Sequence, residues 1–444
     1  MAASGVDQPS KNSMHARIRQ LYIRLSSATF DVPYILSLLV LETILCIVII
    51  RRVAYTEIDW IAYMEEVETY MAGERDYRQI RGGTGPLVYP AGFLYLYRWL
   101  RHVAGGDGAD IRAAQHAFAV LYVMNAAVVL GLYNLVLRQF RRSNRTELSN
   151  AHMTWSWRVA MGLTCLSKRI HSIFVLRLFN DAPAMFLLYA STFLFAKSMW
   201  RTGCLVFSLA VSIKMNVLLF APGLLLLLLQ SQASLWGTAT CLAICAGVQL
   251  MLGAPFLMTF PLAYLRKAFE LDRVFFYKWT VNWKFIPEAI FVSKPLSLLL
   301  LGLHIGCLVF FARKWMASAK EQTGRYLHIH RRLSPAYVVH TMFVSNYIGI
   351  CFSRTLHYQF YSWYFHMLPL MAWMIDDMPL LMRIVLIGMV EYSYNVFPAT
   401  SFSSYVLQSA HFVLMAWLWM GKVPAIVENF RNGKLSSIKG IKGK

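Results

Sequence analysis

Residues 32–50 read VPYILSLLVLETILCIVII and form a long, almost uninterrupted apolar run. A helix needs about 20 mostly apolar residues to cross the hydrocarbon core of a bilayer, and this run has that length and composition. Further apolar runs follow at Val217–Leu229 and Leu296–Phe311. The sequence therefore predicts an all-α, polytopic integral membrane protein.

The composition of the whole chain agrees with this class. Of its 444 residues, 57% are hydrophobic and only 15% are charged. Soluble domains carry about 25% charged residues. A chain with so few charges cannot cover a globule of this size with charged side chains, which excludes an ordinary soluble enzyme.

The chain is also strongly basic, since 43 Lys and Arg residues against 22 Asp and Glu residues give a formal net charge of +21. In a soluble protein this excess would suggest nucleic-acid binding. Here Lys and Arg lie in short blocks between apolar runs, which is how topology is encoded in membranes. We therefore expect the lipid bilayer, and no nucleic acid, as a partner. The seven cysteines lie in or beside apolar stretches, so neither a disulfide framework nor a metal site is predicted.

Three regions follow from this pattern. Residues 1–31 form a polar N-terminal segment, residues 32–420 form one membrane domain without internal repeats, and residues 421–444 form a basic tail. The first apolar run begins only at Val32, which favours a retained anchor over a cleaved signal peptide. Further candidate spans are approximately 113–136, 157–175, 178–200, 202–228, 234–258, 290–312, 336–352, 361–375, 380–397 and 402–420.

The basic blocks predict the number of spans. They occupy the N-terminal segment, 138–145, 313–332 and the C-terminal tail, and the positive-inside rule places all four in the cytosol. Segments 86–103 and 202–228 are ambiguous, so the count lies between eleven and thirteen. Two cytosolic termini require an even number, which predicts twelve. The glycosylation sequon at Asn144 falls in a basic loop, and we expect it to be unmodified.

Acidic residues concentrate in the first lumenal loop, residues 52–85, which holds seven of the 22 carboxylates. A polar stripe recurs there at helical spacing and consists of Asp59, Tyr63, Glu66 and Tyr70. The apolar stripe beside it consists of Trp60, Met64, Val67 and Met71. This pattern predicts a helix lying in the membrane surface. Two interpretations remain open: the helix packs the lumenal edge with solvated acids, or its polar stripe faces a reaction cavity.

Polar clusters interrupt the apolar sequence at 171–181, 212–216 and 354–366. Ionisable groups at membrane depth are costly and usually face a cavity or a partner. The alternative for Asp181 is that it pairs with Arg177 or Lys214 only to neutralise charge. The third cluster is rich in aromatic residues, which fits an interfacial belt as well as a sugar-binding wall.

Two further segments carry weaker signals. The cationic aromatic loop 276–283 suits a phosphate or a sugar, but an interfacial anchor explains it equally well. The glycines at 82, 83 and 85 lie outside any nucleotide-binding motif, so they predict a rigid turn leading back to the bilayer.

Six segments resemble one family. They are Tyr55–Trp60 (YTEIDW), Gly83–Gly92 (GTGPLVYPAG), His171–Asp181 (HSIFVLRLFND), Lys214–Gly223 (KMNVLLFAPG), Trp279–Trp283 (WTVNW) and Leu356–His366 (LHYQFYSWYFH). In this order, and over about residues 32–420, the chain resembles the alpha-1,3-mannosyltransferases of the endoplasmic reticulum that use dolichyl-phosphate mannose.

The resemblance implies the type C glycosyltransferase architecture, a multi-span fold with a lumenal active site, in the endoplasmic-reticulum membrane. It implies transfer of mannose from dolichyl-phosphate mannose to the five-mannose oligosaccharide on dolichyl diphosphate, during lumenal assembly of the asparagine-linked glycan precursor. No cofactor and no metal ion are expected. One departure concerns retention, because Lys442 and Lys444 do not have the usual di-lysine spacing of a retrieval signal.

The implied reaction inverts a β-linked mannosyl phosphate, so one general base suffices. Asp59 matches the acidic residue that type C enzymes place in the first lumenal loop, and we predict that it accepts the proton of the acceptor 3-hydroxyl. Glu57 and Glu66 are supporting candidates that orient the acceptor. The triplet 57–59 resembles a metal-binding acidic motif, but the chain contains no Asp-x-Asp sequence.

The leaving phosphate needs positive charge or hydrogen-bond donors where its negative charge develops. The candidates are Arg177, Lys214, Arg354 and His357. Arg354 and His357 are the first choices because they lie beside the aromatic run. The residues expected to line the donor or acceptor cavity are Asn180, Asp181, Asn216, Gln359, Tyr361, Trp363 and His366.

Other functions fit less well. A secondary transporter or lipid flippase also carries buried ionisable residues, but such proteins tend to show paired repeats and matching broken helices, which this sequence lacks. A non-catalytic membrane subunit does not explain the concentrated lumenal acids. A sister transferase that adds another mannose or glucose is excluded only by the family motifs.

Overall fold

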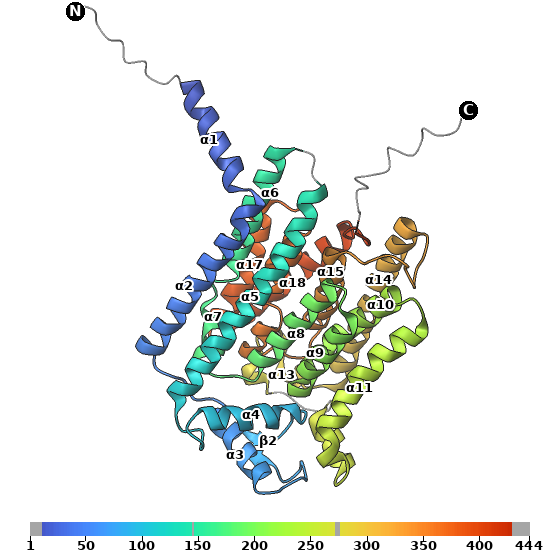
Figure 1. The fold of residues 1–444 in the computed structure, drawn as a ribbon. Coiled ribbons are helices and arrows are strands. Elements are labelled where there is room, and N and C mark those ends of the chain that lie inside the picture. The colour runs from blue at the N-terminus through green and yellow to red at the C-terminus, as the bar shows by residue number, and fades with distance from the viewer. Residues whose placement is uncertain (1–10, 144–145, 271–275, 429–444) are drawn as a thin grey trace, which may run out of the picture.

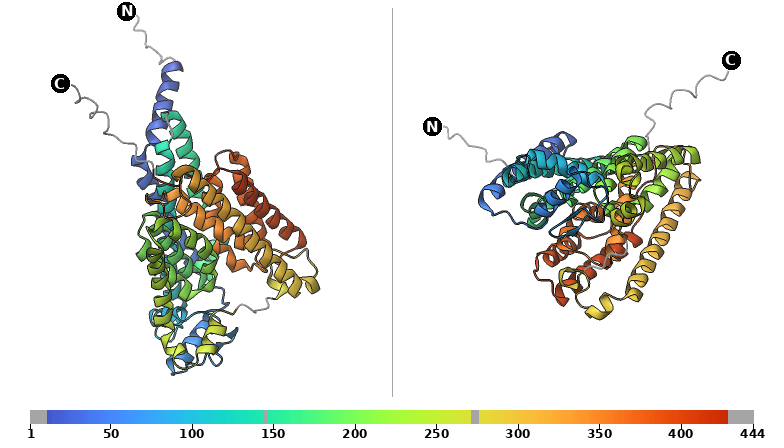
Figure 2. Two further views of the ribbon diagram at one scale, coloured as in Figure 1. Left: turned by 90° about the vertical axis from the view of Figure 1, so that its right-hand side faces the viewer. Right: turned by 90° about the horizontal axis from the view of Figure 1, so that it is seen from below.

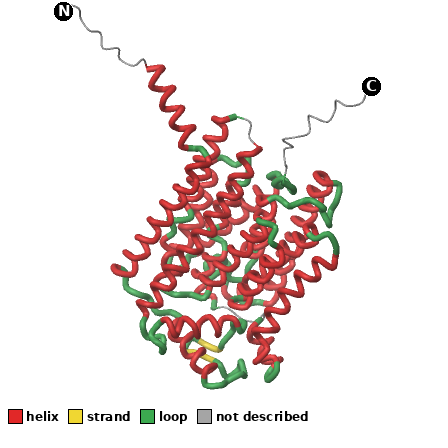
Figure 3. Tube along the Cα trace, in the orientation of Figure 1, coloured by secondary structure: helices red, strands yellow, loops and turns green. Residues whose placement is uncertain are grey.

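The computed structural model describes residues 11–143, 146–270 and 276–428, and most of these residues are helical (Figures 1 and 3). The described segments contain one small sheet, in which β1 (Arg81–Gly82) pairs antiparallel with β2 (Gly85–Pro86). The predicted helical class is confirmed. Asn144, Lys442 and Lys444 lie outside the described residues.

The α-helices of the described segments are α1 (Lys11–Leu25), α2 (Asp31–Arg52), α3 (Trp60–Met71), α4 (Gly92–Val103), α5 (Ile111–Ser143), α6 (Glu147–Leu163), α7 (Lys168–His171), α8 (Asp181–Ala196), α9 (Trp200–Ile213), α10 (Ala221–Ser231), α11 (Leu235–Leu257), α12 (Pro261–Ala268), α13 (Glu288–Phe291), α14 (Lys294–Thr323), α15 (Pro335–Cys351), α16 (Met367–Trp373), α17 (Leu380–Asn395) and α18 (Ser401–Met420). Short 3-10 or π turns are η1 (Ala28–Phe30), η2 (Ser172–Leu176), η3 (Met215–Phe220), η4 (Tyr277–Trp279) and η5 (Tyr358–Trp363).

Helix boundaries follow capping signals in the sequence. The Ser293 side chain accepts a hydrogen bond from the backbone of Leu296 at the start of α14, and Gly324 ends this helix with a φ of 77°. At the start of α15, Ser334 is the N-cap and Pro335 follows it. Every residue of α15 is buried, so this helix forms the centre of the bundle.

Several helices are candidate membrane spans. Within the described segments, four qualify by length and composition: Ala28–Arg52, Ile111–Arg142, Leu235–Leu257 and Lys294–Thr323. A fifth is formed if α6 and the segment Lys168–Leu176, which meet at a bend of 43°, count as one span. These findings fit a membrane protein with several spans.

Some expected spans differ in detail. Segment 202–228 is not one helix, because Lys214 is extended (φ −153°, ψ 127°) and separates α9 from η3 and α10. Segment 361–375 is divided between η5 and α16. Within 86–103, only α4 is helical, and it packs against α3.

The bundle has two distinct ends (Figure 1). Helices α3 and α4 and the small sheet lie at one end, which we call the α3 end. Helix α1 lies at the other, which we call the α1 end. In Figure 2, α17 and α18 lean away from the layer that contains α8, α9 and α11. The acidic loop is thus at the opposite end from α1.

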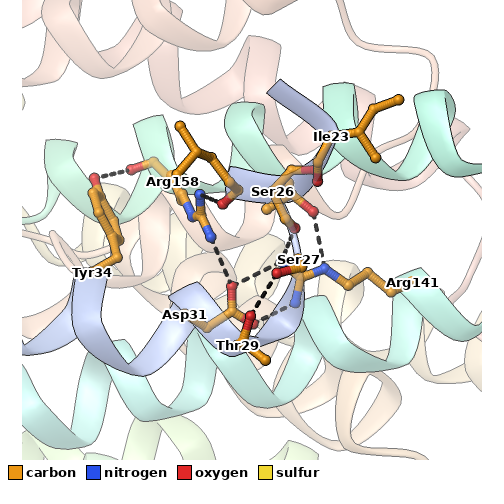
Figure 4. Close-up of polar contacts among 10 residues, drawn as sticks. Ile23, Ser26, Ser27, Thr29, Asp31, Tyr34, Arg141 and Arg158 are labelled. Atoms are coloured by element: carbon orange, nitrogen blue, oxygen red, sulfur yellow. Dashed lines mark hydrogen bonds and ion pairs between the residues drawn. The ribbon is translucent and has the colours of Figure 1, made fainter. Parts of the chain in front are cut away.

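A buried carboxylate ties three helices together at the α1 end (Figure 4). Asp31, the first residue of α2, accepts hydrogen bonds from Arg141 of α5 and Arg158 of α6. The Nη2 atoms of these arginines lie 2.8 Å and 3.3 Å, respectively, from Oδ1 of Asp31. Two guanidinium groups therefore share one carboxylate, and the cluster keeps an excess of positive charge.

Helix α3 is packed on more than one side. Trp60, Met64 and Val67 of the apolar stripe are buried, and so is Glu66 of the polar stripe, which is 4% exposed. The interpretation of solvated acids holds for Glu65 and Glu68, which are exposed, but is wrong for Glu66.

The predicted turn at 82–85 holds the small sheet against α3. A Cβ atom at Gly82 would lie 2.4 Å from the carbonyl oxygen of Ala62, so only glycine permits this approach of β1 to α3. Gly85 has a φ of 140°, which L-residues rarely adopt. The rigid turn predicted from the glycines is confirmed.

Candidate active site

Segments that are distant in sequence meet at the α3 end of the bundle. The loop after α2 is joined to the last residue of η2 by a hydrogen bond from the backbone of Thr56 to the carbonyl of Leu176, 3.0 Å long. The Tyr97 hydroxyl of α4 donates to the carbonyl of Leu178. Leu178 has a φ of 50°, an uncommon conformation for a residue other than glycine. These contacts fix the chain just before Asn180 and Asp181.

A buried ion pair lies where α8 begins and α9 ends. Lys214 Nζ is 2.7 Å from Asp181 Oδ2 and 2.9 Å from Asn180 Oδ1. The indole N–H of Trp363 donates to the other carboxylate oxygen of Asp181. Lys214 is the extended residue that interrupts segment 202–228, and its conformation places its own ammonium group against α8. Of the two partners considered for Asp181, the structure shows Lys214. Arg177 contacts Ser172 instead.

Aromatic rings surround the ammonium group of Lys214. Its Nζ lies 5.5 Å from the ring centre of Tyr89 and 5.8 Å from those of Phe360 and Trp363. Phe360 stacks on Trp363 with a centroid distance of 3.8 Å, and His357 stacks on Phe360 at 5.1 Å. Such cation–π contacts stabilise a lysine ammonium group. The aromatic run of 354–366 therefore contributes a stacked wall to this site.

Asp59 lies beside this cluster, half-buried, at the start of α3. Its side chain does not cap the helix, and the Tyr63 hydroxyl is 3.4 Å from its Oδ2 atom. Burial raises the pKa of Asp59, and the charge of Asp181 adds to this rise, whereas Lys214 opposes it. A carboxylate with a raised pKa is a stronger base than an ordinary aspartate.

The other two carboxylates predicted for the site have different surroundings. Glu57 is exposed, accepts a hydrogen bond from the Tyr55 hydroxyl, and accepts another from the backbone N–H of Ile61 in the first turn of α3. Glu66 is buried, and its Oε2 atom has no hydrogen-bond partner among the described residues. Burial raises the pKa of Glu66 well above its usual value, and Asp59 raises it further. Glu57 thus supports the start of α3, and the surroundings of Glu66 favour its protonated form.

Three further predicted residues lie near the cluster in sequence without a recorded contact to it. Asn216 is buried, with its Nδ2 atom 3.9 Å from the Met185 sulfur and its Oδ1 atom unpaired within the described structure. Arg354 is half-buried in the loop after α15, and its Nε atom lacks a partner among the described residues. Gln359 is half-buried within η5.

Two predicted residues point into helix packing instead. The Tyr361 hydroxyl donates to Glu391 of α17 at 2.8 Å, and its ring stacks on Tyr394. The His366 ring packs edge-on against Tyr189 of α8 and is buried. The structure brings Asp59, Asn180, Asp181, Lys214, His357 and Trp363 together, and it separates Tyr361 and His366 from them.

The sequence-based predictions assign no separate role to Tyr89 and Thr84. Tyr89 is a face of the Lys214 cage, and a hydrogen bond from Thr84 lowers the pKa of Asp59. Both lie in the segment 83–92 that carries one of the family motifs. The family motif 83–92 is longer than a turn requires, and this excess length indicates that Thr84 and Tyr89 have a further role.

This arrangement defines a helical membrane protein with several candidate spans and a polar, partly buried carboxylate site at one end of the bundle. The chain belongs to the ALG3 protein family, which matches residues 36–404. The resemblance to a family of mannosyltransferases is therefore confirmed. No solved structure matches the chain.

Similar proteins share most of the chain. A Mus musculus protein is 43% identical over 430 residues, which cover 94% of each chain. A Homo sapiens protein is 46% identical and covers 85% of this chain and 84% of its own length. An Arabidopsis thaliana protein is 44% identical over 88% of each chain. All three are named Dol-P-Man:Man(5)GlcNAc(2)-PP-Dol alpha-1,3-mannosyltransferase.

Proposed function

We propose that this chain transfers mannose from dolichyl-phosphate mannose to the 3-hydroxyl of a mannose on the five-mannose dolichyl-diphosphate-linked oligosaccharide. The observation that carries this proposal, beside the family, is the half-buried Asp59 next to the Lys214–Asp181 pair. A transporter or flippase does not need a basic carboxylate fixed at one end of its bundle.

The proposed topology has twelve crossings, in a type C glycosyltransferase architecture in the endoplasmic-reticulum membrane. Helix α8 starts beside the site and ends near Lys197, whose carbonyl accepts from Arg332. Helix α9 returns to Lys214, and η3 with α10 runs back toward Leu229, whose carbonyl accepts from the backbone of His328. If each of these short segments crosses the membrane, the basic block 313–332 lies at the α1 end, away from the site. The positive-inside rule then supports a cytosolic α1 end and a lumenal α3 end. A glycan on Asn144 would reverse this orientation.

In the proposed reaction, Asp59 takes the proton of the acceptor 3-hydroxyl while that oxygen attacks C1 of the donor mannose. The bond between C1 and the phosphate oxygen breaks, and its electron pair leaves with dolichyl phosphate. Attack from the face opposite the phosphate inverts the β-linked donor into an α product. A phosphodiester departs without a proton donor, so one carboxylate suffices.

The remaining site residues have supporting roles in this proposal. Arg354, Arg177 and His357 stabilise the negative charge of the departing phosphate. The buried pair of Lys214 and Asp181 sets the electrostatic surroundings of Asp59. Asn180, Asn216, Gln359 and Trp363 line the cavity, and the exposed Glu57 and buried Glu66 support the helix that carries the base.

The deciding experiment supplies the purified chain with both lipid-linked substrates and determines the product linkage. An alpha-1,3-linked mannose on the acceptor is expected. Transport of lipid-linked sugar without transfer, or another linkage, would contradict the proposal. Full activity in excess chelator is expected, because no step of the proposed reaction uses a metal ion, and loss of activity restored by a divalent cation would overturn this expectation.

A further inference from the structure

A groove runs between α2 and α6 toward the α1 end, far from the candidate active site. Its volume is about 590 Å³. It is lined by Tyr34, Leu38, Leu41, Glu42, Leu45, Trp155, Arg158, Val159, Gly162, Leu163, Cys165 and Leu166. Leu41 and Leu166 are 61% and 74% exposed, so the groove opens on the outer face of the bundle, which the apolar composition of α2 assigns to lipid.

One end of the groove carries positive charge. Arg158 is buried, and it shares the carboxylate of Asp31 with Arg141, so the two guanidinium groups are only partly neutralised (Figure 4). The guanidinium carbon of Arg158 also lies 5.0 Å from the ring centre of Trp155. An anionic group is therefore attracted to this end of the groove.

Two hydrogen-bond donors at the same end have no partner. The Nε atom of Arg158 and the Nε1 atom of Trp155 are both buried without an acceptor among the described residues. A buried donor without an acceptor is destabilising, because its desolvation is not compensated by a hydrogen bond. Both residues line the groove, so a ligand with acceptor oxygens would satisfy them.

The other end of the groove disfavours an anion. Glu42 lies eight residues beyond Tyr34 on α2, which is about 12 Å along a helix. Its Oε2 atom is 2.6 Å from both His171 Nε2 and the Tyr122 hydroxyl. Most of the remaining lining consists of leucine and valine side chains. The groove thus accepts an amphipathic molecule in one orientation, with its anionic group at Arg158.

We propose that this groove binds one anionic phospholipid of the surrounding membrane. Its phosphate oxygens accept hydrogen bonds from Arg158 and Trp155, and one acyl chain lies along the leucines of α2. Basic pockets between membrane helices bind lipid phosphates in this way. The bound lipid would reinforce the junction of α2, α5 and α6 that Asp31 forms. This site is at the opposite end of the bundle from Asp59 and is independent of the proposed transfer reaction.

The test uses the full chain, purified in mild detergent, and two photoactivatable lipids. Phosphatidylserine and phosphatidylcholine carry the same diazirine acyl chain, and mass spectrometry maps the cross-linked peptides. Gly162→Leu fills the groove, because the nearest atom to an added Cβ is the Tyr34 hydroxyl at 3.5 Å. Gly247→Leu is the matched control, since nothing lies within 4 Å of its added Cβ and it is not part of the groove.

A second variant keeps the shape of the groove and removes only one donor. Trp155→Phe loses the indole N–H, and Trp236→Phe is its control, because Trp236 is 83% exposed on α11. We expect phosphatidylserine to label 38–45 or 159–166. Labelling should fall about tenfold in W155F, which is the effect of losing a hydrogen bond to a charged group. It should fall at least as far in G162L, because the leucine side chain occupies the groove, and stay unchanged in both controls.

Three outcomes would overturn the proposal. Phosphatidylcholine could label the groove as strongly as phosphatidylserine does, which would show that the groove does not prefer an anionic headgroup. Cross-links could fall outside 38–45 and 159–166. Labelling of W155F could equal that of wild type, once thermal unfolding shows that this variant is folded. Trp155 would then not bind the lipid phosphate, and this conclusion would hold even if G162L failed to fold.

Discussion

The ammonium nitrogen of Lys214 lies 2.7 Å from Oδ2 of Asp181, and both side chains are buried. The pair connects the end of α9 to the start of α8, two helices that pack along their length. Taking two ions out of water is costly, and their attraction repays this cost only while both are present. Losing one partner is therefore worse than losing both.

Lys214→Met should lower the free energy of unfolding by about 3–5 kcal/mol, because it leaves the Asp181 carboxylate buried without its cation. The double variant Asp181→Asn/Lys214→Met should recover part of this loss, since the amide is uncharged and still accepts from Trp363. Denaturant unfolding of the purified protein measures both values. Equal destabilisation in the single and double variants would show that the pair is not coupled.

Asp59→Asn should lower the transfer rate by about 10²–10⁴-fold, the usual contribution of a general base. The amide has the size of the carboxylate and still accepts from Tyr63, so folding and donor binding should persist. Single-turnover transfer and donor binding measure the two effects separately. Glu68→Gln is the control, because Glu68 is an exposed carboxylate on the same helix. A near-normal rate in D59N would show that Asp59 is not the general base.

Glu66→Gln should change how stability depends on pH. The folded-state pKa of Glu66 is raised by burial, so the folded protein binds this proton more tightly than the unfolded chain does. Wild-type stability then falls as pH rises above about 4.3, the usual Glu value, until the folded pKa is passed. Glutamine does not ionise, so the Tm of E66Q relative to wild type should become more positive over this interval. A difference that stays constant with pH would indicate that Glu66 is charged in the fold.

Much of the helical layout could be predicted from the sequence, because long apolar runs and capping residues are local signals. The runs at 113–136 and 234–258 correspond to α5 and α11. The polar cluster at 212–216 marks where segment 202–228 is interrupted, but the extended backbone of Lys214 could not be predicted from the local sequence. Its conformation depends on contacts with Asn180 and Asp181, more than 30 residues away.

The site was predictable as a set of segments but not as a set of contacts. Trp363 and Tyr361 are two residues apart in η5, yet one donates to Asp181 and the other to Glu391. A short 3-10 turn gives no stripe from which to assign these directions. Nothing local in the first apolar run indicates that Glu42 pairs with His171, the first residue of a family motif. Both pairings are decided by packing between distant helices.

Gly82→Ala should destabilise the α3 end, because the new Cβ would lie 2.4 Å from the Ala62 carbonyl oxygen and 2.6 Å from its Cα. Both atoms belong to the backbone of α3, so the sheet must move away, at a cost of about 1–3 kcal/mol. That movement also displaces Thr84 from Asp59 and should lower the transfer rate.

Gly83→Ala is the matched control for this variant, with the same substitution one residue along. The nearest atom to its Cβ is Glu65 Oε2 at 3.5 Å, an ordinary contact with an exposed side chain. Thermal unfolding and transfer rate should therefore stay close to wild type in G83A and fall together in G82A. If G82A matched G83A in both measurements, the close approach of β1 to α3 would not position the proposed base.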